Sequence, residues 1–358
     1  MRHLRILAPF AFFVPSVSLA LLNGGAGNRQ EMQQIEQKVG EVKKLCPLDD
    51  LRKSLSPQDA QKIGRNLLYN ETSCKPGDLA EWDKNEAFPS IGVPHVIWFP
   101  SGVEKNYDES FPRFWKYLQE RNRGSIPIPT SLNRSDIASG SVPALWDSKK
   151  KFDEDPQVRD LNRYLTHPTV LGWQTDFSIQ RGFDAAYKVL ATNTLDAKPK
   201  MSTEVMCRHF RKLFSSPGGV MSVVDYANFK GEGIYPSETK GSAKVRWGLK
   251  QVIESMDDQE LEITTAQRNK ILAIQDAKEK DLYGERQKFA SATKLALKRR
   301  VAADDTISPR LGEQWLKGWG NRIDRTYVGE GISPSQCPLM PGVVDGSNST
   351  ASPSGSVR

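Results

Sequence analysis

The stretch SPQDAQKIGRNLLYNE, residues 56–71, decides the interpretation of the fold. Ser56 and Asp59 have the spacing of a capping box, and Pro57 stands at the first helical position, where its missing N–H costs nothing. Apolar residues then recur on one helix face at Ala60, Ile63, Leu67 and Leu68. The sequence therefore predicts an amphipathic helix that begins near residue 57 and ends near Glu71.

A second stretch, FPSIGVPHVIWFP at residues 88–100, has a different character. It is apolar, β-branched and aromatic, and glycine and proline interrupt it, which is typical of short strands. Beyond residue 110 the apolar residues have helical spacing almost to residue 330. Helices are expected at 110–122, 156–165, 176–192, 203–214, 219–228, 243–256, 260–301 with a break, and 310–318. The predicted class is α+β, mainly α, with a small β-hairpin beside a helical body and a cleft between them.

The N-terminus has the pattern of a secretory signal peptide. Arg2 precedes an apolar run from Ile6 to Val14, and Ser18-Leu19-Ala20 supplies a small-x-small cleavage site. We expect residues 1–20 to contact the membrane transiently, with an uncleaved anchor as the alternative, and the mature protein to be periplasmic or extracellular. The remaining chain divides into a spacer or helix at 21–45, one domain at 46–330, and a disordered tail at 331–358.

Composition narrows the class of partner. The 358 residues carry a formal net charge of +7, which favours polyanionic partners. No nucleic-acid motif accompanies the basic residues, so no nucleic-acid partner is expected. The four cysteines have no CxxC spacing, and two disulfides with three alternative pairings are expected: Cys46, Cys74, Cys207 and Cys337. We expect neither a metal site nor a cofactor.

The pair Asn70-Glu71, followed by Ser90-Ile91-Gly92-Val93-Pro94-His95, resembles the phage-type lysozymes of the lysozyme-like superfamily. Those enzymes place a catalytic Glu at the end of a first helix and a Thr-Ile-Gly-x-Gly-His hairpin after it. The resemblance covers roughly residues 56–100 and implies a lysozyme-like fold. It also implies that Glu71 is the catalytic acid, that Ser90 supplies a hydroxyl near the water or intermediate, and that His95 ends the strand motif. By the same resemblance, Arg322 or Arg325 pairs with a carboxylate of the cleft.

Glycoside cleavage also needs a second group that stabilises the cationic sugar or activates water. The position of the family's catalytic Asp is Lys84 here, so Asp83 or Glu86 is the nearest substitute. Glu232, in the segment VDYANFKGEG at residues 224–233, is a further candidate. Side chains that hydrogen-bond sugar hydroxyls are expected at His95, Tyr226, Asn228, Glu232 and Arg325.

The expected function is cleavage of β-1,4 links between amino sugars of peptidoglycan, by a glycosidase or a lytic transglycosylase. Three alternatives stay open. Lys84 and Pro94 favour a catalytically silent, exported wall-binding or envelope structural protein on the same fold. A chitosanase-like hydrolase would have a cleft richer in acids, because its polymer is cationic. The third alternative is an exported helical adaptor in which the motif match is accidental.

Overall fold

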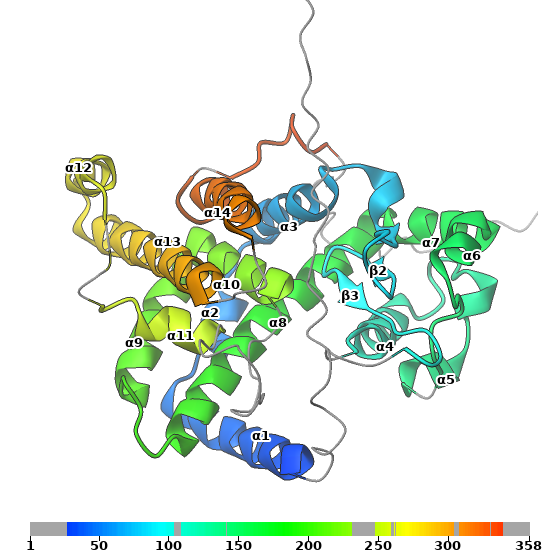
Figure 1. Ribbon diagram of the computed structural model, residues 1–358, viewed down its shortest axis with the longest axis horizontal. Helices are drawn as coiled ribbons and strands as arrows, with labels where there is room; N and C mark the ends of the chain where they lie inside the picture. Colours follow the sequence, from blue (N-terminus) through cyan, green and yellow to red (C-terminus); the bar gives the residue numbers. More distant parts are fainter. Residues whose placement is uncertain are drawn as a thin grey trace, which may run out of the picture.

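The computed structural model describes residues 27–103, 109–140, 142–230, 248–258, 261, 263–303, 308–329 and 331–338. Within these ranges the protein is mainly helical and has one small antiparallel sheet, so the predicted mainly helical α+β class is confirmed (Figure 1). The predicted signal peptide, Glu232 and residues 339–358 of the predicted tail lie outside the described residues. None of the helices in the described ranges is long and apolar enough to span a bilayer.

A long buried helix, α8 (Pro168–Leu195), forms the centre of the helical body. Apolar and small residues cover most of its circumference, and a helix of this kind is stable when it is surrounded by other elements. The helices of the body that pack around it include α1 (Gly27–Leu45), α3 (Pro57–Thr72), α9 (Thr203–Phe214), α10 (Pro217–Lys230) and α11 (Leu249–Glu254). Gly182 permits the close crossing of α8 and α10, since a Cβ there would lie 2.6 Å from Cγ2 of Val224.

The C-terminal elements add a further layer to the helical body. They are α12 (Thr265–Ala273), α13 (Ala277–Ala303), α14 (Pro309–Ile323) and the π-helical turn η3 (Asp324–Val328). In this layer α13 and η3 pack directly on α10. Both α10 and α13 pack against η3, while α14 packs on α13 and lies beside α3 in Figure 1. The short helix α2 (Asp49–Lys53) precedes α3 and packs on α9.

The sheet lies on the side of α3 away from α14 (Figure 1). Its strands are antiparallel and have the order β1-β2-β3. Its strands are β1 (Ala80–Glu81), β2 (Ser90–Ile91) and β3 (Val96–Ile97). The predicted hairpin is confirmed, with Ile91 paired to Val96. Two helices pack on the sheet: α4 (Phe111–Asn122) on β3 and α7 (Pro156–Leu165) on β1. The other elements of this part of the chain are η1 (Pro76–Asp78), η2 (Thr130–Leu132), α5 (Ser135–Ala138) and α6 (Lys149–Glu154).

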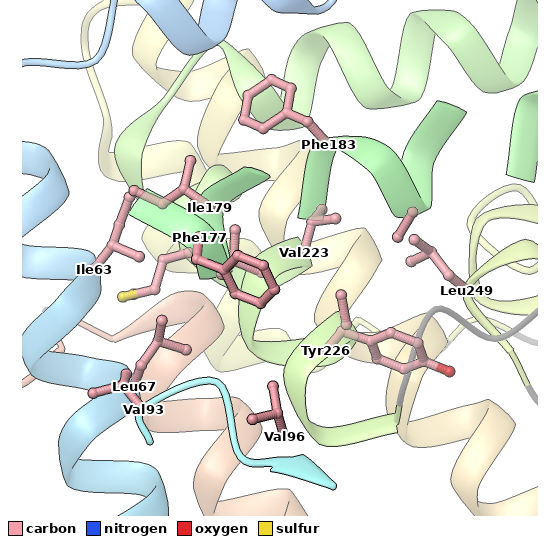
Figure 2. Close-up of a cluster of buried hydrophobic side chains, with 14 of the residues drawn as sticks. Ile63, Leu67, Val93, Val96, Phe177, Ile179, Phe183, Val223, Tyr226 and Leu249 are labelled. Carbon is pink, nitrogen blue, oxygen red and sulfur yellow. The ribbon is translucent and has the colours of Figure 1, made fainter. Parts of the chain in front are cut away.

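The hairpin is joined to the helical body by a continuous apolar core. Side chains from α3, the hairpin, α8 and α10 converge there (Figure 2). Ile63 and Leu67 come from α3, Val93 and Val96 from the hairpin, and all four side chains are at most 1% exposed. Each fully buried aliphatic side chain contributes about 1.5–3 kcal/mol, so the hairpin is held against α3 by the hydrophobic effect.

Several helix boundaries differ from the sequence expectation. The helix expected at 176–192 begins at Pro168 instead, because His167 accepts a hydrogen bond from the N–H of Thr169 and caps it. The long segment expected at 260–301 is broken between Ala273 and Ala277. Of the helix expected at 243–256, the described part covers Leu249–Glu254.

Two disulfides form, and they select one of the three pairings left open by the sequence. Cys46 is joined to Cys207, and Cys74 is joined to Cys337. The second bond holds residues 331–338 beside the C-terminal end of α3, where Ile332 is 3% exposed and its N–H donates to Asn66 Oδ1. In this segment, expected to begin a disordered tail, Ile332 and Cys337 are buried against the body and residues 333–336 between them are exposed.

A buried histidine connects α9 to α13. His209 Nδ1 contacts the Glu285 carboxylate, and Nε2 lies 3.2 Å from Asp257 Oδ2. Burial alone would lower the pKa of His209, but the two carboxylates outweigh it and the pKa is raised. Lys288 Nζ lies 3.6 Å from Asp257 Oδ1, so the Asp257 carboxylate pairs with Lys288 as well as with His209.

This cluster predicts a pH-dependent contribution to stability. The folded pKa of His209 is above its unfolded value near 6.5, so the contribution is fully present below that pH and is lost as pH rises through the folded pKa. We expect the loss of unfolding free energy in His209→Gln to be larger at pH 6 than at pH 9, as measured by urea denaturation. Lys270→Gln, at an exposed lysine of α12, is the control. An equal loss at both pH values would contradict the assignment.

Candidate active site

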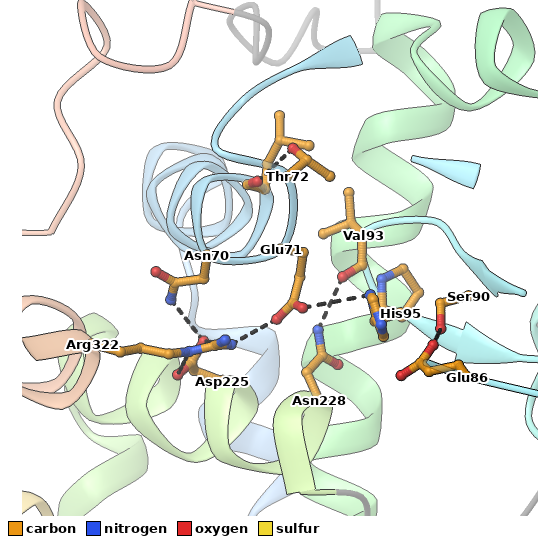
Figure 3. A network of polar contacts seen from close by, with 12 residues as sticks. Asn70, Glu71, Thr72, Glu86, Ser90, Val93, His95, Asp225, Asn228 and Arg322 are labelled. Atoms are coloured by element: carbon orange, nitrogen blue, oxygen red, sulfur yellow. Dashed lines mark hydrogen bonds and ion pairs between the residues drawn. The ribbon is translucent and has the colours of Figure 1, made fainter. Parts of the chain in front are cut away.

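Glu71 lies in the last turn of α3 and points toward the β-hairpin (Figure 3). Its side chain is 5% exposed. Its Oε1 accepts a hydrogen bond of 2.6 Å from Arg322 Nη2, and its Oε2 lies 3.6 Å from His95 Nδ1. One oxygen of the carboxylate is thus fixed by the C-terminal helices, and the other is turned to the hairpin.

Arg322 bridges two carboxylates from different helices. Its Nε and Nη2 donate to the two oxygens of Asp225 at 3.0 and 2.7 Å, and Nη2 also donates to Glu71. Burial would lower the pKa of Arg322, but Asp225 and then Glu71 outweigh this effect and the pKa is raised. The bidentate pair with Asp225 is the stronger geometry, because two parallel N–H···O bonds fix the guanidinium plane.

A second layer of hydrogen bonds holds this cluster in place. Asn70 Nδ2 donates to Asp225 Oδ1 at 2.8 Å and to the Thr326 hydroxyl at 3.0 Å. Arg325 Nη2 donates to Asn70 Oδ1 at 2.6 Å, and its guanidinium lies over the Tyr69 ring, 4.7 Å from the centroid. The end of α3 is therefore tied to α10, to α14 and to η3.

The hairpin tip at residues 92–95 is anchored by three buried side chains. Gln174 Oε1 accepts from the N–H of Val93, Asn228 Nδ2 donates to the Val93 carbonyl at 3.3 Å, and Arg181 Nη1 donates to the Pro94 carbonyl at 3.1 Å. Gln174 and Arg181 come from α8, and Asn228 comes from α10. Because each anchor binds the backbone, the position of the tip is set by the helices and not by the sheet.

The same tip contains two residues with left-handed backbone. Gly92 has φ +77°, and a Cβ there would lie 2.7 Å from Gln174 Oε1. His95 has φ +49°, a conformation that L-residues adopt rarely and at a cost. The His95 side chain is 35% exposed, so it reaches both the buried Glu71 and solvent.

Glu86 and Ser90 form a second polar pair on the hairpin side. The Ser90 hydroxyl donates to Glu86 Oε2 at 3.5 Å, the outer limit of a hydrogen bond. Burial raises the pKa of Glu86, the charge of His95 acts against this, and Asp83 adds to it. In Figure 3 the His95 ring lies between the Glu71 carboxylate and this pair.

The other candidates from the sequence lie in different environments. Asp83 accepts from the backbone N–H and side chain of Asn85 at 2.7 and 2.9 Å, so it stabilises its own turn. Tyr226, expected to bind sugar, is 1% exposed and packs its ring on Phe289 in the core. Asn228 is 7% exposed and holds the hairpin tip. Of the two arginines expected to pair with a carboxylate of the cleft, Arg322 contacts Glu71.

Sequence reasoning did not select Asp225 or the hairpin anchors Gln174 and Arg181, and it selected the third anchor, Asn228, for a different role. Asp225 is a lone acid in the apolar run GGVMSVVDYANF, and a charge in such a run signals a buried ion pair. Gln174 and Arg181 carry no comparable signal, because their partners are backbone groups of a distant hairpin. Among the described residues, no group of three or more His, Cys, Asp or Glu could hold a metal ion.

Comparison with known proteins finds no matching family model, no matching curated protein and no matching solved structure. The chemistry of the site is therefore inferred from its own residues.

The left-handed Gly92 provides a test of how the tip is held. Gly92→Ala strains the backbone and displaces Gln174, so we expect it to lower the unfolding free energy by about 1–3 kcal/mol. Gly77→Ala is the matched control, since Gly77 has ordinary φ and open space around it. Urea denaturation measures both variants, and equal stability would show that the tip tolerates a different conformation.

The shared guanidinium provides a second test. Arg322→Met leaves Glu71 and Asp225 buried without their partner, and breaking a buried ion pair costs about 3–5 kcal/mol. Arg310→Met, at an exposed arginine of the same helix, is expected to change stability by less than about 0.5 kcal/mol. Similar losses in the two variants, measured by thermal and urea unfolding, would rule out a structural role for the Arg322 cluster.

Proposed function

We propose that the protein is a lysozyme-like enzyme that cleaves the glycan of peptidoglycan, with Glu71 as general acid. The observation that carries this proposal is the position of Glu71. Glu71 lies almost fully buried where α3 meets the hairpin, with Oε2 directed to the hairpin side. A glycosidase acid needs this combination of shielding from water and orientation toward the scissile oxygen.

The surroundings of Glu71 fix its position. Arg322 donates two hydrogen bonds to Asp225 and one to Glu71, so Glu71 is the second carboxylate on one guanidinium. This contact uses Oε1 and leaves Oε2 on the hairpin side, where a glycosidic oxygen would have to lie.

We assign the second carboxylate of the reaction to Glu86. It is half-buried, its pKa is raised, first by burial, and it contacts the Ser90 hydroxyl on the hairpin. Ser90 then orients the attacking water or the sugar beside Glu86. Asp83 is the weaker candidate because its carboxylate is used within its own turn. Glu232 lies outside the described residues and stays a prediction.

We also propose that the protein acts outside the cytoplasm. Two disulfides, Cys46–Cys207 and Cys74–Cys337, are typical of proteins that fold in an oxidising compartment. The net charge of +7 favours binding to a wall that carries anionic polymers. Arg325 and His95 are then candidates for contacts to the sugar near the acid.

A chitosanase-like activity is the second candidate, and one local observation favours it. The hairpin side of the site is acidic although the whole chain is basic: Asp78, Glu81, Asp83 and Glu86 lie within nine residues. Burial raises the pKa of Glu81, and Asp78 raises it further, so these charges act on one another. Such a surface would favour a glycan with free amino groups.

Substitution of the acid tests the proposal. We expect Glu71→Gln to lower glycan release from purified peptidoglycan by at least about 100-fold, because a general acid contributes about 10²–10⁴-fold to the rate. The variant should remain folded at the assay temperature, because Gln keeps an oxygen acceptor for Arg322 and Asp225 still pairs with Arg322 through two hydrogen bonds; circular dichroism checks this. Glu120→Gln, at an exposed Glu in the last turn of α4, is the matched control and should retain full activity.

Two further measurements separate the alternatives. Glu86→Gln should reduce the rate far more than Asp83→Asn if Glu86 is the second carboxylate. Mass spectrometry of the products distinguishes hydrolysis from transglycosylation, and parallel assays on acetylated and deacetylated glycan distinguish the two polymer classes. Undetectable turnover by the wild-type protein on every glycan would support the silent wall-binding alternative and reject the enzyme.

A further inference from the structure

We propose that His95 is a proton relay between Glu86 and Glu71, which restores the acid after each catalytic cycle. The proposal rests on the proposed function. It adds a role for His95, which the sequence resemblance placed at the end of a strand motif. It starts from the position of the imidazole, which lies between the Glu71 carboxylate and the Ser90–Glu86 pair in Figure 3.

The geometry places His95 between the two ends of such a path, which are Glu71 and Glu86. Nδ1 lies 3.6 Å from Glu71 Oε2, a separation that a small side-chain rotation or one bridging water closes. On its other side the ring faces the Ser90–Glu86 pair (Figure 3). The side chain is 35% exposed, whereas Glu71 is 5% exposed. His95 therefore connects a shielded acid to groups that exchange protons with water.

The backbone supports a positioning role. His95 is held at φ +49°, which costs about 1–2 kcal/mol relative to an ordinary conformation. Hydrogen bonds fix the tip and keep the residue there: Gln174 accepts from the N–H of Val93, and Asn228 and Arg181 donate to carbonyls of the tip. A strained residue persists where its surroundings determine the conformation, and such residues concentrate at functional sites.

The charges around the imidazole come from several elements. Glu71 faces it from α3, and Glu81 and Glu86 act on it from the segment before β2. On the far side of Glu71 is Arg322, and on the far side of the tip is Arg181. Carboxylates thus lie on both sides of the ring, the arrangement that a proton path between them requires.

The proton balance of the cycle is closed. Glu71 gives its proton to the departing oxygen as the glycosidic C–O bond breaks. Water bonds to the sugar carbon and loses a proton to the Glu86 carboxylate. Glu86 then passes this proton to Nε2 of His95, while Nδ1 releases its own proton to Glu71. The imidazole ends as the other tautomer and returns through proton exchange with solvent.

The test compares His95→Asn with the wild type over a range of pH. Asn tolerates the left-handed conformation but does not titrate, so the fold is kept and the relay is removed. We expect kcat to fall by about 10-fold or more, with KM nearly unchanged. The basic limb of the pH profile should shift, because the variant has lost one titratable group from the proton path.

Chemical rescue and a matched variant complete the experiment. His95→Gly suits φ +49° and leaves space at an exposed position, so added imidazole should restore activity in proportion to its concentration. His167→Asn is the control, since His167 is exposed and Asn is a good N-cap for α8.

The outcomes separate the two proposals. If the wild type is active, an unchanged pH profile in His95→Asn, or no rescue of a folded His95→Gly protein, overturns the relay and leaves the general acid in place. If the wild type releases no fragment from any glycan, the proposed function fails and the relay fails with it. A shifted basic limb together with imidazole rescue supports the relay.

Discussion

The site depends on the Arg322 guanidinium, which is buried between Asp225 and Glu71. The interaction joins three helices that are far apart in the sequence: α3, α10 and α14. An unpaired charge at that depth costs several kcal/mol, so these helices cannot separate without a large penalty. The cluster therefore fixes the end of α3 against α10 and α14. This explains why a carboxylate in the last turn of a helix, normally solvated, is held at 5% exposure.

The opposite wall of the site is fixed by a different kind of interaction. The sheet has two-residue strands and could not by itself hold the hairpin tip in one position. Buried side chains of α8 and α10 bind the backbone of the tip instead, and the apolar residues of the hairpin pack on α3. The strained φ of His95 is the cost of this arrangement. The helical body thus supplies rigidity, and the hairpin supplies the polar groups.

The sequence predicted the parts of the fold that are written in local patterns. The capping box at Ser56 and the apolar stripe of residues 60–68 fixed α3 and hence Glu71 at its end. The hairpin was recognised from composition, but β1 was missed because two residues carry no period. The site was predicted less completely, because its contacts are long-range. Asp225 lies 97 residues from Arg322, and no local pattern encodes which buried Arg a buried Asp will meet.

The disulfide between Cys74 and Cys337 closes three residues after Glu71 and 15 residues after Arg322 along the chain. Glu71 and its partner Arg322 are thus 251 residues apart in the sequence. A chain that emerges from its N-terminus completes this centre last, since early segments fold before late ones are available. Any activity of the centre is consequently delayed until synthesis and oxidative folding are nearly finished. Incomplete chains that lack α14 also lack Arg322 and cannot form this centre.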